Sequence, residues 1–248
     1  MKAIALILFL LLTLPAFAGS RRFTYVYEVT TSPPGDVEIE NWLTWKTDKA
    51  DDRGFREIDF RHELEFGITE KFQAAIYLAD WNYHRGTSAG ERGFTLGGSA
   101  LELIYNFTNP VADPIGIAAY QEFQAGYRRF ESESKLLAQK NLGRFVAAYN
   151  TTLEAEWEGE GLEEHQGEFQ QSLGLSYEVS PHLLFGAEFL HEVAFPDWSK
   201  AGRGKFFAGP NISIRRGTRW ATLTALGQIT SAGDEPNFQV RTVFGFSF

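Results

Sequence analysis

Hydrophobic and polar side chains alternate along most of this chain, and the segment from Phe55 to Ile68 shows the pattern most clearly. Its even positions from Ile58 onward are apolar apart from His62, whereas its odd positions from Glu57 to Glu65 are all charged. Successive side chains of a strand point to opposite faces, so this segment would have one lipid-like face and one ionised face. Its length exceeds that of an ordinary soluble strand. The pattern predicts a strand with hydrocarbon on one side and water on the other.

The end of the chain alternates in the same way. One face carries Val240, Thr242 and three aromatic rings, while the other carries Gln239, Arg241 and Ser247. A closing strand that ends on an aromatic residue is typical of bacterial outer-membrane barrels, in which the barrel-assembly machinery recognises this strand. We therefore expect that machinery as a partner and predict an assembly signal made of Phe244, Phe246 and Phe248.

The alternation recurs about twelve times, the even number expected of a bacterial barrel. The predicted strands span 37–46, 55–67, 71–83, 94–107, 115–130, 132–140, 144–158, 165–179, 182–195, 204–215, 218–230 and 237–248. Tight connections such as 67–71 and 216–218 alternate with longer polar ones such as 84–93 and 196–204. The fold class predicted is all-β: a single closed antiparallel transmembrane barrel of about twelve strands with both termini in the periplasm.

The beginning of the chain indicates export. Lys2 precedes an apolar run, residues 3–14, and the run is followed by Pro15-Ala16-Phe17-Ala18, an A-x-A cleavage pattern. The expected organisation is a signal peptide at 1–18, an N-terminal lead at 19–35 and the barrel at 36–248. The lead could be a periplasmic arm, an extra strand or a lumenal plug. The predicted location is the bacterial outer membrane, where lipid and lipopolysaccharide would surround the protein.

Composition narrows the possible chemistry. The chain has no cysteine, so it offers neither a disulfide framework nor a thiolate metal site. Its formal net charge of −9 argues against nucleic acid as a partner. After residue 18 no segment approaches the roughly 20 apolar residues of a transmembrane helix. Insertion into a membrane would therefore depend on strands that close on themselves.

Three features carry a family resemblance: Pro33-Pro34-Gly35 before the first acidic strand, the turn Gly67-Ile-Thr-Glu-Lys-Phe72, and the terminal Phe248. With them the chain resembles the small porin-like and transporter-like outer-membrane barrels of Gram-negative bacteria. The resemblance covers nearly all of the chain after residue 18. It implies an architecture and transfers no catalytic residue, cofactor or metal ligand.

A barrel of about twelve strands is wide enough for either a narrow pore or a blocked one. The inward-facing series is mostly acidic, so a pore would favour cations or neutral polar solutes. Inward aromatic rings could stack against flat solutes, although a one-residue bulge would move a ring to the interfacial girdle. The predicted lumen-lining residues are Glu38, Glu40, Trp42, Glu57, Asp59, Arg61, Glu63, Glu65, Tyr77, Trp81, Glu102, Tyr120, Glu122, Arg128, Glu154, Glu188 and Arg241.

The function expected is passive passage of small polar, cationic or aromatic solutes. An enzyme of the lipid-hydrolase or protease type is an alternative, but no histidine has a serine two positions later and no G-x-S-x-G elbow occurs. A structural or adhesive barrel is a third alternative. The acidic stretch 153–169 could attract divalent cations. It lacks calcium-loop spacing, however, and its composition indicates a solvated outer loop.

Overall fold

The alternating segments form thirteen strands in the computed structural model, which describes residues 20–87 and 92–248. No α-helix occurs within these two ranges, so none of the residues described there forms a helix that could span a membrane. The strands are β1 Val37–Lys49, β2 Arg56–Thr69, β3 Phe72–Arg85, β4 Arg92–Leu96, β5 Gly98–Thr108, β6 Gly116–Gly126, β7 Arg129–Leu142, β8 Phe145–Glu158, β9 Glu164–Ser180, β10 Leu183–Pro196, β11 Lys205–Arg216, β12 Arg219–Gln228 and β13 Pro236–Ser247.

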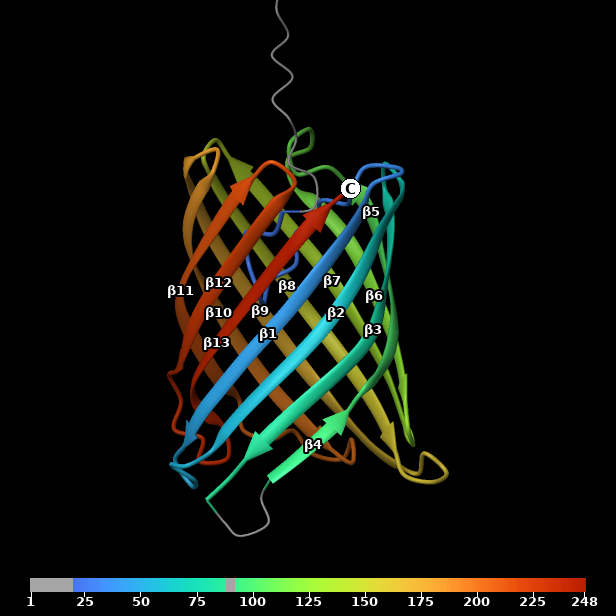
Figure 1. Cartoon of the computed structure of the whole chain (residues 1–248), viewed down its shortest axis with the longest axis vertical. Coiled ribbons are helices and arrows are strands. Elements are labelled where there is room, and N and C mark those ends of the chain that lie inside the picture. The colour runs from blue at the N-terminus through green and yellow to red at the C-terminus, as the bar shows by residue number, and fades with distance from the viewer. Residues whose placement is uncertain (1–19, 88–91) are drawn as a thin grey trace, which may run out of the picture.

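Twelve of these strands close into an antiparallel barrel, which confirms the predicted all-β barrel of about twelve strands (Figure 1). Each strand pairs with its neighbours in the sequence, and β1 pairs with β13 to close the ring. The extra strand, β4, pairs with the half of β3 that β5 does not reach. A break at Gly97 separates β4 from β5, so the single strand expected over 94–107 is divided in two.

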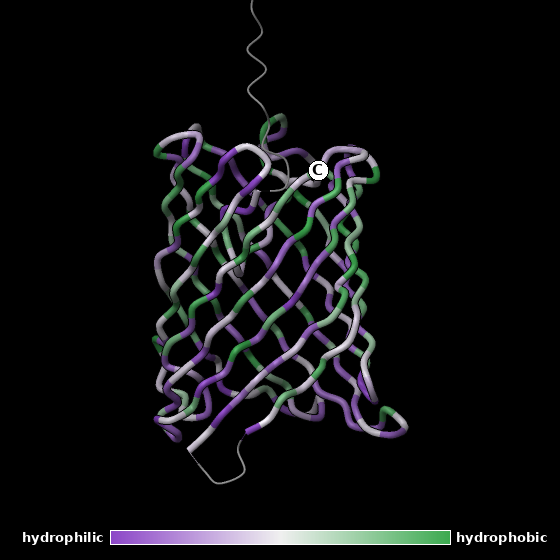
Figure 2. The backbone as a smooth tube through the Cα atoms, in the orientation of Figure 1, coloured by the Kyte–Doolittle hydropathy of each residue, from purple (hydrophilic) through white to green (hydrophobic). Residues whose placement is uncertain are grey.

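The two faces of the barrel differ as strand alternation requires. Figure 2 shows hydrophilic and hydrophobic positions alternating along the strands. On β5, Glu102 and Ile104 are buried, whereas Leu101 and Tyr105, which flank them on the other face of the strand, are exposed. An exposed row of large apolar side chains around the barrel is what contact with lipid demands.

The two ends of the barrel carry connections of different length. One end, called the terminal end here, is where β1 begins and β13 finishes: Phe248 N donates a hydrogen bond to Val37 O at 2.9 Å. Most connections at the terminal end have two residues, as in Gly217–Thr218, although residues 109–115 form a longer one. At the opposite end, called the loop end, connections are mostly longer, as at 197–204 and 229–235. Two residues alone, 127–128, join β6 to β7 there.

Residues 20–35 are called the inner segment. Residues 20–32 lie inside the barrel rather than along its wall, whereas Pro33, Pro34 and Gly35 are exposed. Figure 1 shows this segment dipping into the barrel at the terminal end before β1 begins. Its apolar side chains between residues 23 and 29 are almost completely buried: Phe23, Tyr25, Val26, Tyr27 and Val29. Inward-facing apolar residues of the barrel pack around them in three clusters. The segment therefore has a core of its own within the lumen. The expected signal peptide, 1–18, lies outside the described residues.

Candidate functional site

A cavity of about 700 Å³ lies in the lumen between the inner segment and the loop end. Thr24, Tyr25 and Tyr27 of the inner segment bound it on one side. At the other side its lining reaches Phe55 and Pro236, which lie beside the connections of the loop end. The barrel is thus hollow toward the loop end and filled toward the terminal end.

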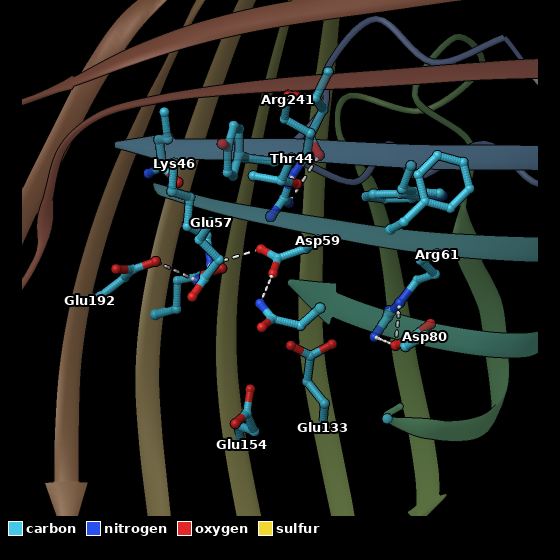
Figure 3. Close-up of a pocket in the computed structure, with 18 of the residues that line it drawn as sticks. Thr44, Lys46, Glu57, Asp59, Arg61, Asp80, Glu133, Glu154, Glu192 and Arg241 are labelled. Atoms are coloured by element: carbon cyan, nitrogen blue, oxygen red, sulfur yellow. Dashed lines mark hydrogen bonds and ion pairs between the residues drawn. The ribbon is translucent and has the colours of Figure 1, made fainter. Parts of the chain in front are cut away.

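Charged side chains dominate the wall of this cavity. Six basic and nine acidic residues contribute to the lining, which leaves a surplus of acids. Figure 3 shows carboxylates from several strands directed into the same space. The acidic lining residues are Glu57, Asp59, Asp80, Glu122, Glu131, Glu133, Glu154, Glu192 and Glu235.

Most basic residues of the wall already have an acidic partner. Lys46 Nζ lies 2.8 Å from both Glu57 Oε1 and Asp59 Oδ2. The Arg61 guanidinium lies 2.8 Å from Asp80 Oδ2, and Figure 3 shows this pair on adjacent strands β2 and β3. Pairing of this kind cancels local charge, so the carboxylates without a basic partner determine the sign of the remaining potential.

Glu154 and Glu192 are two such carboxylates. Within the described part of the chain, the Glu154 carboxylate makes no hydrogen bond or ion pair, and the Glu192 carboxylate accepts only a 3.3 Å hydrogen bond from Gln170. Arg241 is their counterpart among the cations: its guanidinium bonds Thr44 Oγ1 at 2.9 Å and lies 4.0 Å from the centre of the Tyr25 ring. The cavity therefore presents exposed charge of both signs, with acid in excess.

Glu188 anchors the inner segment from β10. Its carboxylate accepts hydrogen bonds from three consecutive backbone N–H groups, those of Thr24, Tyr25 and Val26, at 2.9, 2.7 and 3.1 Å. Thr224 and Asn211 donate to the same carboxylate. Because Glu188 is fully buried, these donors replace the water that its charge would otherwise require.

Side-chain amides hold the rest of the segment by imitating a strand partner. Asn150 accepts from Tyr27 N at 2.6 Å and donates to Tyr27 O at 3.0 Å. Gln139 accepts from Val29 N at 2.8 Å, and Gln73 accepts from Ser32 N at 2.9 Å. Backbone groups that enter a barrel lumen need partners, and the wall supplies them through side chains rather than through its own backbone.

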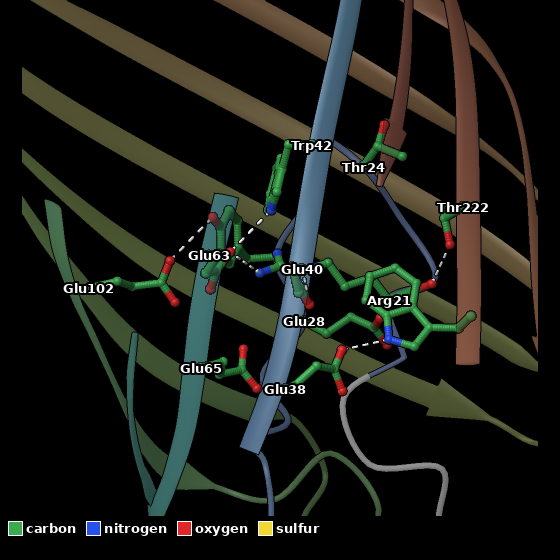
Figure 4. Close-up of polar contacts among 12 residues, drawn as sticks. Arg21, Thr24, Glu28, Glu38, Glu40, Trp42, Glu63, Glu65, Glu102 and Thr222 are labelled. Atoms are coloured by element: carbon green, nitrogen blue, oxygen red, sulfur yellow. Dashed lines mark hydrogen bonds and ion pairs between the residues drawn. The ribbon is translucent and has the colours of Figure 1, made fainter. Parts of the chain in front are cut away.

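Arg21 occupies the centre of the polar contacts drawn in Figure 4. Its Nε lies 2.8 Å from Glu40 Oε2, and its guanidinium stacks 4.4 Å from the Tyr27 ring centre and 4.6 Å from that of Trp42. Trp42 Nε1 in turn donates to Glu63 at 3.1 Å. One cation thus links the inner segment to β1 and, through Trp42, to β2.

The predicted lumen residues fall into two groups. Those that line the cavity are Trp42, Glu57, Asp59, Arg61, Trp81, Tyr120, Glu122, Glu154 and Arg241. Those buried at the level of the inner segment, away from the cavity lining, are Glu38, Glu40, Glu63, Glu65, Tyr77, Glu102 and Glu188. The second group holds polypeptide or neighbouring side chains, as Glu38 does by accepting from Trp220 Nε1 at 2.5 Å.

Two residues of the prediction differ from the expected arrangement. Trp81 lines the cavity, but a bulge in β3 at Leu78 shifts the alternation there by one residue, and its ring stacks against Phe60 at 5.3 Å and Phe94 at 5.9 Å. Arg128 lies in the turn after β6 with a φ of 55°, and it pairs with Glu160 at the loop end. The strand predicted to continue to residue 130 ends at Gly126.

Sequence reasoning also missed the partners of the inner segment. Asn150, Gln139 and Asn211 were not singled out, although each bonds its backbone directly. Their signal was present as neutral amides on inward positions otherwise rich in charge. An amide that both donates and accepts suits a peptide group better than an ionised side chain does.

Comparison with other proteins gives one family. Residues 15–243 match the family described as "Family of unknown function (DUF6662)". Comparison with curated proteins gives no match.

Several solved structures share the fold. The COG4313 outer-membrane channel from Pseudomonas putida F1 has a TM-score of 0.67 at 13% identity, over 91% of this chain and 100% of that chain. The β domain of the Bordetella autotransporter BrkA has a TM-score of 0.58 at 12% identity, over 87% and 100%. The KdgM porin in complex with oligogalacturonate has a TM-score of 0.52 at 8% identity, over 86% and 98%. The porin-like barrel expected from the sequence is confirmed as a fold.

Proposed function

Because the chain belongs to the DUF6662 family, whose function is unknown, we propose its function from geometry: an outer-membrane channel for small polar, cationic or aromatic solutes. The observation that carries this proposal is the 700 Å³ charged cavity that reaches the loop end of a closed barrel. The signal-like N-terminus and the exposed apolar belt support placement in an outer membrane. In that placement the terminal end faces the periplasm and the loop end faces outside.

The acidic surplus of the cavity supports a preference for cations. Fixed charges on the wall of a narrow, low-dielectric passage act on every solute that enters it. The KdgM porin has been solved with oligogalacturonate, an acidic sugar chain. The excess of carboxylates in the cavity of the present protein argues for cationic rather than anionic solutes.

The inner segment would close the passage at the periplasmic side. Solute that enters from the loop end reaches Tyr25 and Tyr27 and meets a filled lumen beyond them. Transport would then require the inner segment to move. Such movement would be reversible, because the wall side chains that hydrogen-bond the backbone of the inner segment can bond water instead.

Conductance in a planar bilayer tests this function. We expect low, cation-preferring conductance from the intact protein and a clearly larger conductance after deletion of residues 20–32, because that deletion removes the buried residues of the lumen. Glu154→Gln together with Glu192→Gln should reduce cation preference, since these carboxylates have no basic partner. The control is Glu133→Gln, whose charge Lys135 already offsets. An anion-selective pore, or a deletion variant that folds and stays closed, would contradict the proposal.

A further inference from the structure

Three carboxylates meet beneath Trp42, on the wall that faces the inner segment. Glu63 and Glu65 project from β2 and Glu102 projects from β5, and one oxygen from each lies within 4.8 Å of the other two. Figure 4 shows the three groups directed toward one another. Each is at most 4% exposed, so little water can separate their charges.

Two oxygens of this cluster lack partners. Glu63 Oε1 and Glu102 Oε1 are buried and accept no hydrogen bond from any residue that the structure describes. The opposite oxygens of the same groups are engaged, that of Glu63 by Trp42 and that of Glu102 by Tyr77. Orphaned buried carboxylate oxygens carry a large desolvation penalty, and they mark a place where a positive group is needed.

The basic residues nearest to the cluster do not supply that positive group. Arg21 lies 3.7 Å from Glu63 Oε2 but is 2.8 Å from Glu40. Arg61 pairs with Asp80, and Lys135 lies 2.6 Å from Glu133. Each of these cations has a closer carboxylate of its own. Among the described residues only Arg21 forms an ion pair with the cluster, so three carboxylates share part of one positive charge.

We propose that Glu63, Glu65 and Glu102 form a binding site for one hard divalent cation, Ca²⁺ or Mg²⁺. Carboxylate oxygens are the ligands that these ions prefer, and the two orphaned oxygens become ligands. The ion joins β2 to β5. It also stabilises the inner segment, because the Ser32 hydroxyl donates to Glu65 and Tyr27 Oη lies 3.4 Å from Glu102 Oε2. The ion thus helps to hold the inner segment against the barrel wall.

A second acidic group, Glu131, Glu154 and Glu156, has the same spacing but a different environment. Arg129 lies 2.9 Å from Glu131 and 2.8 Å from Glu156, so a cation is already present. This group provides the matched control for the buried site.

Terbium luminescence tests the proposal in the purified, refolded barrel. Tb³⁺ replaces Ca²⁺ at oxygen sites and is excited by neighbouring aromatic rings, and Trp42, Tyr77 and Tyr27 all contact the cluster. We expect one equivalent of Tb³⁺ to give sensitised emission that Ca²⁺ or Mg²⁺ competes away. Glu102→Gln should weaken binding by about tenfold or more, because loss of a direct ligand costs at least as much as loss of an outer partner.

Glu156→Gln, in the group that Arg129 already neutralises, should leave the emission unchanged. Each variant is first shown to be folded by its β-sheet circular dichroism, so a loss of emission reports on the site. As a measurement independent of substitution, Ca²⁺ should raise the unfolding temperature of the native protein, because an ion bound only to the folded state stabilises it. Absence of stoichiometric binding, or binding that Glu156→Gln abolishes and Glu102→Gln does not, would overturn the proposal. Neither result depends on whether the barrel conducts.

Discussion

At the scale of single residues, charge in this lumen serves two purposes that the sequence does not distinguish. Glu188 and Glu192 lie on the same face of β10, two positions apart on that face. Glu188 is fully buried and binds three backbone N–H groups, whereas Glu192 lines the cavity. Alternation predicts that Glu188 points inward, but its partner is a segment more than 160 residues away, which no local pattern reveals.

The anchoring role of Glu188 is testable by truncation. Glu188→Ala removes the acceptor of the Thr24, Tyr25 and Val26 N–H groups, so it should lower the free energy of unfolding by roughly 2 to 5 kcal/mol. It should also raise conductance, because the inner segment loses its strongest attachment. Urea unfolding in lipid vesicles and bilayer recording measure the two effects.

The matched control is Glu192→Ala, on the same face of the same strand but with no hydrogen bond to the inner segment. It should change ion preference while leaving the free energy of unfolding nearly unaltered. Equal loss of stability in both variants would show that Glu188 does not anchor the segment.

At the scale of elements, strands were predictable to within a few residues because alternation and turn residues act locally. The range expected for the strand at 144–158 lies within one residue of β8, Phe145–Glu158. The errors arose where one residue breaks the period. The bulge at Leu78 shifts the alternation of β3 by one residue, and the turn at Arg128 ends β6 early. Such irregularities depend on pairing with neighbouring strands, which is information that the single strand does not contain.

Close packing between an element of the wall and the inner segment gives another prediction. A Cβ at Gly174 of β9 would lie 2.6 Å from the Phe23 ring, so Gly174→Val should displace that ring. Valine favours strands, so β9 should still form. We expect increased conductance and increased protease sensitivity of the inner segment, with unchanged circular dichroism.

Gly227→Val on β12 is the control, since a Cβ there meets no atom within 4 Å. It should retain the conductance and protease resistance of the native protein. If Gly174→Val behaves in the same way, Phe23 does not fix the position of the segment.

At the scale of the whole molecule, closure of the ring follows from the sequence, whereas the filling of its lumen does not. Amphipathic strands in a lipid bilayer must pair all their backbone polar groups, and closure into a barrel achieves this. The inner segment carries apolar residues such as Phe23 and Tyr27, but a periplasmic arm, an extra strand and a plug were equally compatible with them. The barrel wall distinguishes these three alternatives. Ile104 and Leu137 point into an otherwise polar lumen, where they pack against the apolar side chains of the inner segment.

The seam of the ring is formed by the last strand, and it gives the final prediction. Along β13, Phe246 pairs with Ile39 of β1 and with Arg219 of β12, and its ring is 38% exposed on the outside. Phe248 N closes the seam at Val37, with its ring 75% exposed. Replacement of Phe244, Phe246 and Phe248 by alanine keeps every backbone pair of the seam but removes the aromatic row. We therefore expect normal refolding in detergent, and a several-fold loss of the assembled barrel in cells if assembly machinery recognises that row.

Phe189→Ala is the control: it removes a comparably exposed ring, 42%, from β10, and the variant should assemble normally. Immunoblots of heat-modifiable barrel in outer-membrane fractions measure the difference. Equal assembly of the two variants would mean that the exposed rings serve only as contacts with lipid.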